Sequence, residues 1–344
     1  MDDWKQIELN DACSRLSSGK SISAKYVTSE GIYPIYGGNG IRGYTDIYNF
    51  DGECAIIGRQ GAYCGNVRYF SGKAYMTEHA VVTCGNESSN TRFLAYLLST
   101  MQLGRLSGQS AQPGLSVKTI GQQVIKLPPL KVQNIIADML TALDEKIEVN
   151  ESINKNLMEQ ALTLYTTHFT TLEKNGCIGD YCSIKSGFAF KSSWWTDSGI
   201  KVIKIGSINQ DNLNLLECSY VDENKINKVN DFKVRAGDLL IAMTGATIGK
   251  FAMVPYSSET LLVNQRVGKF FLGNKPVEKL PFIYCTLKQP DVYYEIVNRG
   301  QGSAQPNISG SDIMSIPCVI PSKEAIDEFN CINQPLFDLS LIHI

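Results

Sequence analysis

The chain has 344 residues, of which 43% are hydrophobic and 19% charged, so it is long enough for two domains of ordinary size. No stretch approaches the 18 apolar residues of a membrane span and the acidic start has no apolar signal region, so we expect a cytoplasmic protein with no membrane partner. A net charge of −2 excludes the large basic excess of proteins that coat nucleic acid indiscriminately.

The first predicted domain covers residues 1–128. Its clearest pattern is GECAIIGRQGAYCGNV at 52–67, in which an apolar run leads into a Gly-Ala-x-x-Gly turn. Gly61 and Gly65 permit backbone angles that are closed to other residues, so the pattern predicts a buried strand, a tight turn and a second strand. The polar phrase SGQSAQPGLS follows at 107–116.

Residues 129–175 are predicted to form a helical spacer, because no Gly or Pro occurs from Lys131 to Phe169 and apolar residues recur at alternating steps of four and three. The helix would be about 60 Å long, which is typical of a coiled coil with a partner strand. Asn154 takes a seam position where a buried Asn fixes register. The predicted seam contains Ile136, Leu140, Leu143, Ile147, Asn150, Asn154, Leu157, Ala161 and Leu164.

The second predicted domain, residues 176–321, repeats the first. GDLLIAMTGATIGKF at 237–251 matches 52–67 with one insertion near Gln60, and GQGSAQPNIS at 300–309 matches SGQSAQPGLS. In the second match Gln305 takes the place of Gln112, an offset of 193 residues, and the agreement continues into the following apolar run. The sequence therefore predicts an α+β fold with two similar β-rich domains joined by a long coiled-coil helix.

Residues 322–344 begin a second helical region, which we expect to be truncated because the chain ends at Ile344 before a long helix could form. The final LSLIHI departs from the polar heptad pattern. It can be encoded by the adaptor of a transposon-based sequencing library, so we expect a gene fragment that runs into adaptor sequence.

The order and duplication of these motifs resemble the specificity (S) subunit of type I restriction-modification systems. The resemblance reaches to about Leu339 and is carried by LPPLKVQNIIADMLTALDEKI (127–147), GFAFKS (187–192), GDLLIAMTGATIGK (237–250) and the two Gln-Pro loops. It implies that each domain is a target recognition domain for one half of a bipartite sequence in double-stranded DNA. It also implies an antiparallel helix pair that sets the distance between half-sites and docks methyltransferase (M) subunits, with restriction (R) subunits joining the complex.

Polar side chains near the glycine turns are candidates for DNA contact. Arg or Lys pairs with guanine and Gln or Asn with adenine, at about 1–3 kcal/mol of discrimination for each good bidentate contact. The alternative is an ordinary solvated hairpin tip, and Arg105 and Arg299 are expected at phosphates. The candidates are Arg42, Arg59, Gln60, Asn66, Arg68, Arg105, Lys191, Thr244, Thr247, Lys250, Gln265, Arg266 and Arg299.

The two Gln-Pro loops are interpreted as structural hinges between each domain and its helix. Both copies share them, whereas two different half-sites would require different reading residues. The hinge residues are Gln109, Gln112, Pro113, Gln301, Gln305 and Pro306.

The sequence predicts no catalytic residue, no metal and no cofactor. Ten cysteines form no Cys-x-x-Cys pair, only three histidines are present, and GATIGK at 245–250 lacks the spacing and the final Ser or Thr of a phosphate-binding loop. We therefore expect a chain that contributes recognition and no activity of its own. The resemblance implies that it does so in a complex with adenine methyltransferase, endonuclease and ATP-dependent translocase activities. Two alternatives stay open: a protein- or glycan-binding scaffold dimerised through the coiled coil, and an enzyme whose site is not evident.

Overall fold

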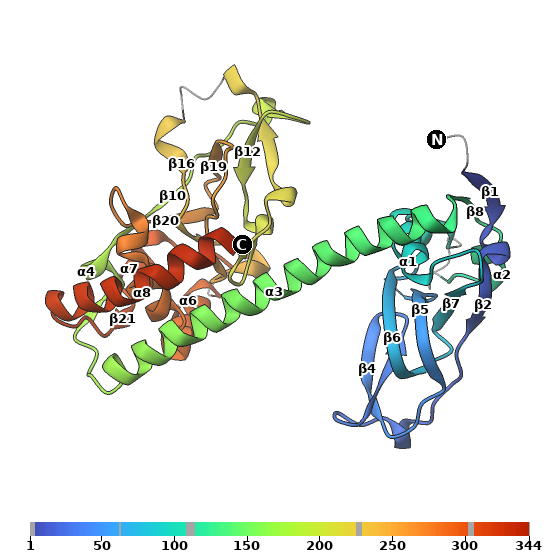
Figure 1. Ribbon diagram of the computed structural model, residues 1–344. Coiled ribbons are helices and arrows are strands. Elements are labelled where there is room, and N and C mark those ends of the chain that lie inside the picture. Colours follow the sequence, from blue (N-terminus) through green and yellow to red (C-terminus); the bar gives the residue numbers. More distant parts are fainter. Residues whose placement is uncertain (1–3, 62, 108–113, 225–228, 302–305, 344) are drawn as a thin grey trace. The chain divides into compact units, whose positions relative to one another are not determined.

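The computed structural model describes residues 4–61, 63–107, 114–224, 229–301 and 306–343 (Figure 1). It contains two compact units, Met1–Lys146 and Ile147–Ile344. Helix α3 (Leu130–Phe169) begins in the first unit and ends in the second, as the unbroken heptad pattern predicts. Within the described residues, no helix combines the length and the apolar character needed to cross a membrane.

The first unit is built on a six-stranded sheet with the order β2-β7-β5-β6-β3-β4 (Figure 1). Neighbouring strands are antiparallel except β3 and β6, which are parallel. A separate antiparallel pair joins β1 to β8, and β8 ends three residues before α3 begins. The elements are β1 (Lys5–Glu8), β2 (Cys13–Ser18), β3 (Tyr33–Gly37), β4 (Gly40–Thr45), β5 (Phe50–Gly58), β6 (Val67–Met76), β7 (Ala80–Gly85), α1 (Thr91–Thr100), α2 (Val117–Gly121) and β8 (Val124–Leu127).

The second unit contains a four-stranded sheet, β10-β20-β17-β18, and a five-stranded sheet, β11-β15-β12-β19-β16. Two short pairs, β13-β14 and β9-β21, complete it. The strands are β9 (Gly176–Cys177), β10 (Ser183–Ser186), β11 (Trp195–Thr196), β12 (Ile200–Ile203), β13 (Ile208–Asn209), β14 (Asn212–Leu213), β15 (Ser219–Val221), β16 (Lys233–Val234), β17 (Leu239–Ala242), β18 (Phe251–Met253), β19 (Leu261–Val263), β20 (Val267–Phe271) and β21 (Pro317–Cys318). The helices are α4 (Ile178–Tyr181), α5 (Leu280–Leu287), α6 (Pro290–Gly300), α7 (Gly310–Met314) and α8 (Lys323–His343).

Both units share one scaffold. The order β2-β7-β5-β6 in the first sheet corresponds to β10-β20-β17-β18 in the second, and the pair β1-β8 corresponds to β9-β21. After the Gln-Pro phrase the correspondence is residue by residue, because α2, β8 and α3 begin at 117, 124 and 130 whereas α7, β21 and α8 begin at 310, 317 and 323. Each of these pairs differs by the 193 residues that separate the two phrases in the sequence.

What is added to the scaffold differs between the units. The first unit extends its sheet with the hairpin β3–β4 next to β6. The second unit instead builds its five-stranded sheet around a separate cluster of buried residues that includes Phe190, Trp194, Val202 and Leu262. Trp194 stacks on Phe188 with ring centroids 5.6 Å apart, so it is a core residue.

Helix α3 is buried near its ends and exposed in its middle. Ala137 belongs to the core of the first unit, and Met158, Ala161, Tyr165 and Phe169 belong to that of the second. Of the predicted seam, Leu143 and Ile147 are 57% and 56% exposed, and Ile136, Leu140, Asn150, Asn154, Leu157 and Leu164 are partly buried. In the second unit Ala161 of the predicted seam is fully buried. On either side of it, however, the core includes Met158 and Tyr165, whereas the predicted Leu157 and Leu164 are only partly buried.

Helix α8 packs antiparallel to the second half of α3. The ring of Phe329 lies 5.3 Å from that of Phe169 and 5.8 Å from that of Tyr165, whereas Ser340, near the end of α8, lines a cavity together with Asn154. The segment LSLIH continues α8, and its Leu341 is buried in the core, although the heptad pattern did not include it.

Gln133 joins α3 to the first unit through a buried side chain. Its Oε1 accepts from the backbone N–H of Asn90, before α1, and its Nε2 donates to the carbonyls of Ser88 and Pro128, all at 2.8–2.9 Å.

We expect Gln133→Ala to lower the free energy of unfolding of the first unit by about 2–3 kcal/mol, because buried backbone groups lose their partners. Urea unfolding monitored by hydrogen exchange in peptides of residues 86–100 measures this, and the exposed Gln160→Ala on the same helix is the control, expected within about 0.5 kcal/mol of the parent.

The cysteines predict a graded response to alkylation. All ten are free, Cys331 is exposed, and burial raises the pKa of the Cys54 and Cys182 thiols to about 12. Because the thiolate is the reactive form, only about 0.01% of such a thiol is reactive at pH 8, and this fraction rises about tenfold for each pH unit. We expect iodoacetamide at pH 8 to label Cys331 first in the folded protein. Peptide mass spectrometry would contradict this if Cys54 or Cys182 reacted as fast.

Candidate nucleic-acid interface

The glycine turn between β5 and β6 is folded tightly onto its own domain. Gly61 and Gly65 adopt φ values of 82° and 85°, and the Gly65 N–H donates to the Gly58 carbonyl at 2.7 Å. A Cβ on Gly65 would lie 2.1 Å from the backbone nitrogen of Gly104. Only glycine fits this contact, because both the space and the backbone angle exclude a side chain.

The Gln-Pro phrase ends against this turn in both units. In the first unit the Leu115 N–H donates to the Arg59 carbonyl at 2.9 Å, and Gln60 pairs with Gly114 as an isolated β-bridge. In the second unit the Ile308 N–H donates to the Met243 carbonyl, also at 2.9 Å, and Thr244 pairs with Asn307 as an isolated β-bridge. We call this pair of interactions the turn clamp.

The phrase also begins the next helix. Ser116 accepts from the Thr119 N–H at 2.9 Å at the start of α2, and Ser309 accepts from the Asp312 N–H at 3.1 Å at the start of α7. The described end of each phrase therefore fastens the chain to the hairpin and caps a helix. In the described part of the phrase, backbone hydrogen bonds hold the chain on both sides, and the hinge role expected for the two loops stays a prediction.

Of the predicted hinge residues, two are described. The Pro306 carbonyl accepts from the Gly245 N–H at 2.9 Å, and the Gln301 N–H donates to the Asn298 carbonyl at 3.1 Å at the end of α6. The others, Gln109, Gln112, Pro113 and Gln305, lie outside the described residues.

A surface concavity in the first unit, with a volume of about 500 Å³, brings two of the predicted DNA-contact residues together. It is lined by Gly37, Gly38, Asn39, Gly40, Ile41, Arg42, Gln60, Gly61 and His79. We call it the glycine-walled concavity. The β3–β4 turn closes onto the end of β5, since a Cβ on Gly58 would lie 2.0 Å from the Gly38 carbonyl oxygen. Arg42 and Gln60 therefore face the same space although they come from different hairpins.

Arg68 lies next to this concavity. Its Nη1 is 2.9 Å from the point where a Cβ on Gly40 would be, and the side chain is exposed. Burial raises the pKa of Tyr36, and the positive charge of Arg68 opposes that rise. Asn66 is exposed at the end of the same turn, and its carbonyl accepts from the Gly58 N–H at 2.9 Å.

Three of the predicted arginines are used within the protein. The Arg59 Nη1 donates to Ser18 Oγ at 3.0 Å and the Arg105 Nη2 to the Met101 carbonyl at 3.1 Å. Arg299 donates to Glu295, the Asp312 carbonyl and Ser315 at 2.7–3.1 Å, which ties α6 to α7. These guanidinium groups hold the scaffold, so the structure provides a role for them that does not require DNA.

The second unit places its candidates on two neighbouring turns. Thr244, Thr247 and Lys250 are half-buried on the turn between β17 and β18, and Gln265 and Arg266 are exposed between β19 and β20. The two turns are joined because the Met243 N–H donates to the Arg266 carbonyl at 3.0 Å.

The same patch extends toward Lys191. The Gln265 N–H donates to the Phe188 carbonyl at 2.9 Å, and Lys191 is exposed three residues beyond Phe188 in the chain.

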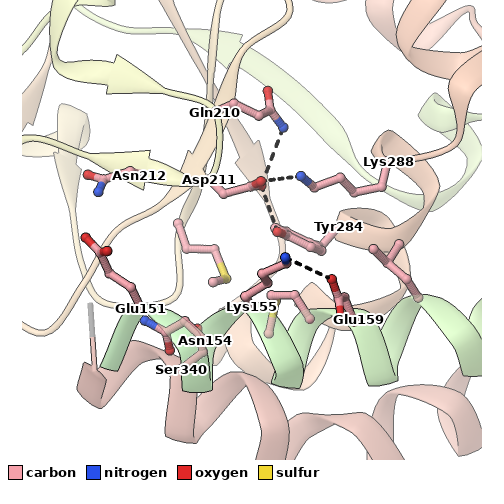
Figure 2. Close-up of a pocket in the computed structure, with 13 residues that line it drawn as sticks. Glu151, Asn154, Lys155, Glu159, Gln210, Asp211, Asn212, Tyr284, Lys288 and Ser340 are labelled. Atoms are coloured by element: carbon pink, nitrogen blue, oxygen red, sulfur yellow. Dashed lines mark hydrogen bonds and ion pairs between the residues drawn. The ribbon is translucent and has the colours of Figure 1, made fainter. Parts of the chain in front are cut away.

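A separate cavity of about 440 Å³ lies between α3, α5 and the β13–β14 turn of the second unit (Figure 2). Asp211, with φ 63°, accepts from the Tyr284 hydroxyl at 2.7 Å and forms an ion pair with Lys288. Lys155 pairs with Glu159 at 3.8 Å. Since these charges satisfy one another, the arrangement is typical of a structural junction rather than of a catalytic site.

The predicted seam residue Asn154 also lines this cavity. It is half-buried, and its Oδ1 has no hydrogen-bond partner among the described residues.

Among the described residues there is no cluster of three or more His, Cys, Asp or Glu side chains placed to hold a metal ion. The residues that sequence reasoning missed are Asn39 and His79, which line the glycine-walled concavity. The run GGNG at 37–40 was the available signal for the first, because Gly and Asn at these positions favour a two-residue hairpin turn.

The family model described as "Type I restriction modification DNA specificity domain" matches residues 1–159 and 173–330. The chain belongs to this family. The EcoprrI specificity subunit of Escherichia coli is 40% identical over 134 residues, which cover 38% of this chain and 33% of that protein. The MjaVIII specificity subunit of Methanocaldococcus jannaschii is 23% identical over 255 residues, which cover 67% of this chain and 60% of that protein. This chain therefore spans less than two thirds of either relative.

A solved structure supports the fold. The S subunit of the type I restriction-modification system from M. genitalium matches with a TM-score of 0.62 and 18% sequence identity, over 98% of this chain and 90% of that chain. At this identity the likeness concerns the architecture, and it agrees with the predicted α+β fold.

Proposed function

We propose that this chain is the sequence-reading subunit of a type I restriction-modification complex and that each of its units reads one half of a bipartite target in double-stranded DNA. The observation that carries the proposal is one scaffold built twice with different surfaces, in a chain of the specificity family. Corresponding scaffolds provide the same frame for two readers, and different surfaces allow two different half-sites. Candidate contacts lie around the glycine-walled concavity and on the turns of the second unit.

The partners in this proposal are M subunits docked on the helical region and R subunits that join through the complex. The middle of α3 supports a docking role, since its apolar residues Met139, Leu143, Ile147 and Val149 are each more than half exposed. Exposed apolar side chains in such numbers favour a protein partner. Methyl transfer to adenine, cleavage and translocation would belong to the partners.

The test is to express the chain with the M subunit encoded beside its gene in a host that lacks DNA methylation and to map modified adenines. We expect a single split motif with a fixed gap. Exchanging residues 1–128 for those of another member of the family should change one half of the motif and leave the other half and the gap unchanged.

Altered recognition in both halves would contradict two independent readers. A chain that co-purifies with the M subunit but directs no methylation would overturn the reading function and favour the protein- or glycan-binding scaffold.

The spacing role of α3 has its own test. Seven residues inserted after Ile147 lengthen a helix by about 10 Å and turn it by nearly two full turns, so the register is almost kept. At about 3.4 Å per base pair, we expect the gap between half-sites to widen by two or three base pairs.

The matched control replaces the exposed residues Glu145, Lys146 and Glu148 by alanine without changing the length, and the gap should stay as it was. The same motif mapping measures both variants. An unchanged gap in an insertion variant that still methylates DNA would show that α3 does not set the spacing.

A further inference from the structure

Arg42 occupies an irregular position in the β3–β4 hairpin. In the ladder Ile35 faces Gly43 and Tyr36 faces Ile41, so Arg42 is the extra residue of a β-bulge. A bulge turns one side chain out of the regular alternation, which explains why Ile41 and Arg42 are both exposed although they are neighbours. The aliphatic part of Arg42 lies over Gly37, with its Cδ 3.3 Å from the point where a Cβ on that glycine would be.

The guanidinium of Arg42 has no hydrogen bond or ion pair with any described residue. This separates it from Arg59, Arg105 and Arg299, whose donors are used within the protein. The side-chain amide of Gln60 is likewise unpaired among the described residues and exposed. Two strong donor groups are therefore held by a fixed backbone, and neither donates to a residue in the described part of the chain.

The walls of the glycine-walled concavity allow another molecule to approach the backbone. Gly37, Gly38, Gly40 and Gly61 contribute no side chain, and both Arg42 and Gln60 are fixed at their backbones, one by the bulge and the other by the turn clamp. Because Arg42 and Gln60 line one concavity of about 500 Å³, the groups that they contact on another molecule must lie close together.

We infer that Arg42 and Gln60 read bases in the half-site of the first unit: Arg42 a guanine, through its O6 and N7, and Gln60 an adenine, through its N6 and N7, in base pairs no more than two steps apart. The inference rests on the proposed function. The chemistry is that of bidentate pairing, in which two parallel donors match the two acceptors of guanine and an amide matches the donor and acceptor of adenine.

The experiment compares the parent chain with Arg42→Ala, Gln60→Ala and Arg42→Gln, each co-expressed with the M subunit, by mapping methylated adenines. In the parent, one half-site should contain a G·C pair within two steps of an A·T pair. We expect Arg42→Ala to lose about 5- to 150-fold of the discrimination at the guanine, Gln60→Ala to relax the adenine, and Arg42→Gln to shift the preference from guanine to adenine. Arg266→Ala is the matched control in the second unit, and any change that it causes should be confined to the other half-site.

A second readout separates base reading from a structural role. Methylation of duplexes with 7-deazaguanine at the assigned position removes the N7 acceptor alone, so it should slow the parent complex several-fold and the Arg42→Ala complex less than twofold. The inference is overturned if Arg42→Ala leaves the motif unchanged, lowers methylation equally at all sites, or alters the half-site that Arg266→Ala alters. These three outcomes leave the proposed function intact. The proposed function itself would be overturned by a parent chain that directs no methylation at a split motif.

Discussion

The turn clamp is the contact on which each unit depends. One backbone hydrogen bond, Leu115 to Arg59 in the first unit and Ile308 to Met243 in the second, joins the tip of the central hairpin to the segment that leads to the helix. Each such bond adds only about 0.5–1.5 kcal/mol, but it fixes the register of everything that follows. Because Ser116 and Ser309 cap the next helices immediately afterwards, the start of α3 and that of α8 are tied to the hairpin through a few residues.

The clamp explains why the residues that end the phrase correspond in the two units while the surfaces differ. The clamp uses backbone groups and glycine turns, which both units must keep to hold their scaffold. The additions to the scaffold are free of that requirement, so the first unit has the β3–β4 hairpin with its bulge and the second has a five-stranded sheet. A protein of the specificity family gains from this division, because new surfaces can be built on an unchanged frame.

Helix α3 illustrates how a repeating pattern can be correct about an element and incomplete about its contacts. The spacing of apolar residues predicted an unbroken helix, and the helix runs from Leu130 to Phe169. The pattern could not identify the partner of each segment, because a helix that packs on a domain core and one that packs in a coiled coil show nearly the same period. The middle of the helix is exposed within this chain, and the buried positions near its end follow the core of the second unit.

The sequence by itself determined the duplication, the hairpins at the glycine turns, the long helix and the family, since these follow from local rules of backbone geometry and from the order of motifs. The tertiary structure decided which polar residues are available. Arg42, Arg59, Arg105 and Arg299 look alike in the sequence. Only the folded chain shows that three of them donate to their own protein, whereas Arg42 has no such partner among the residues that the structure describes. It also brought Arg42 and Gln60 to one concavity from two hairpins. Contacts between distant segments depend on how sheets and turns pack, and no local pattern in a single sequence contains that information.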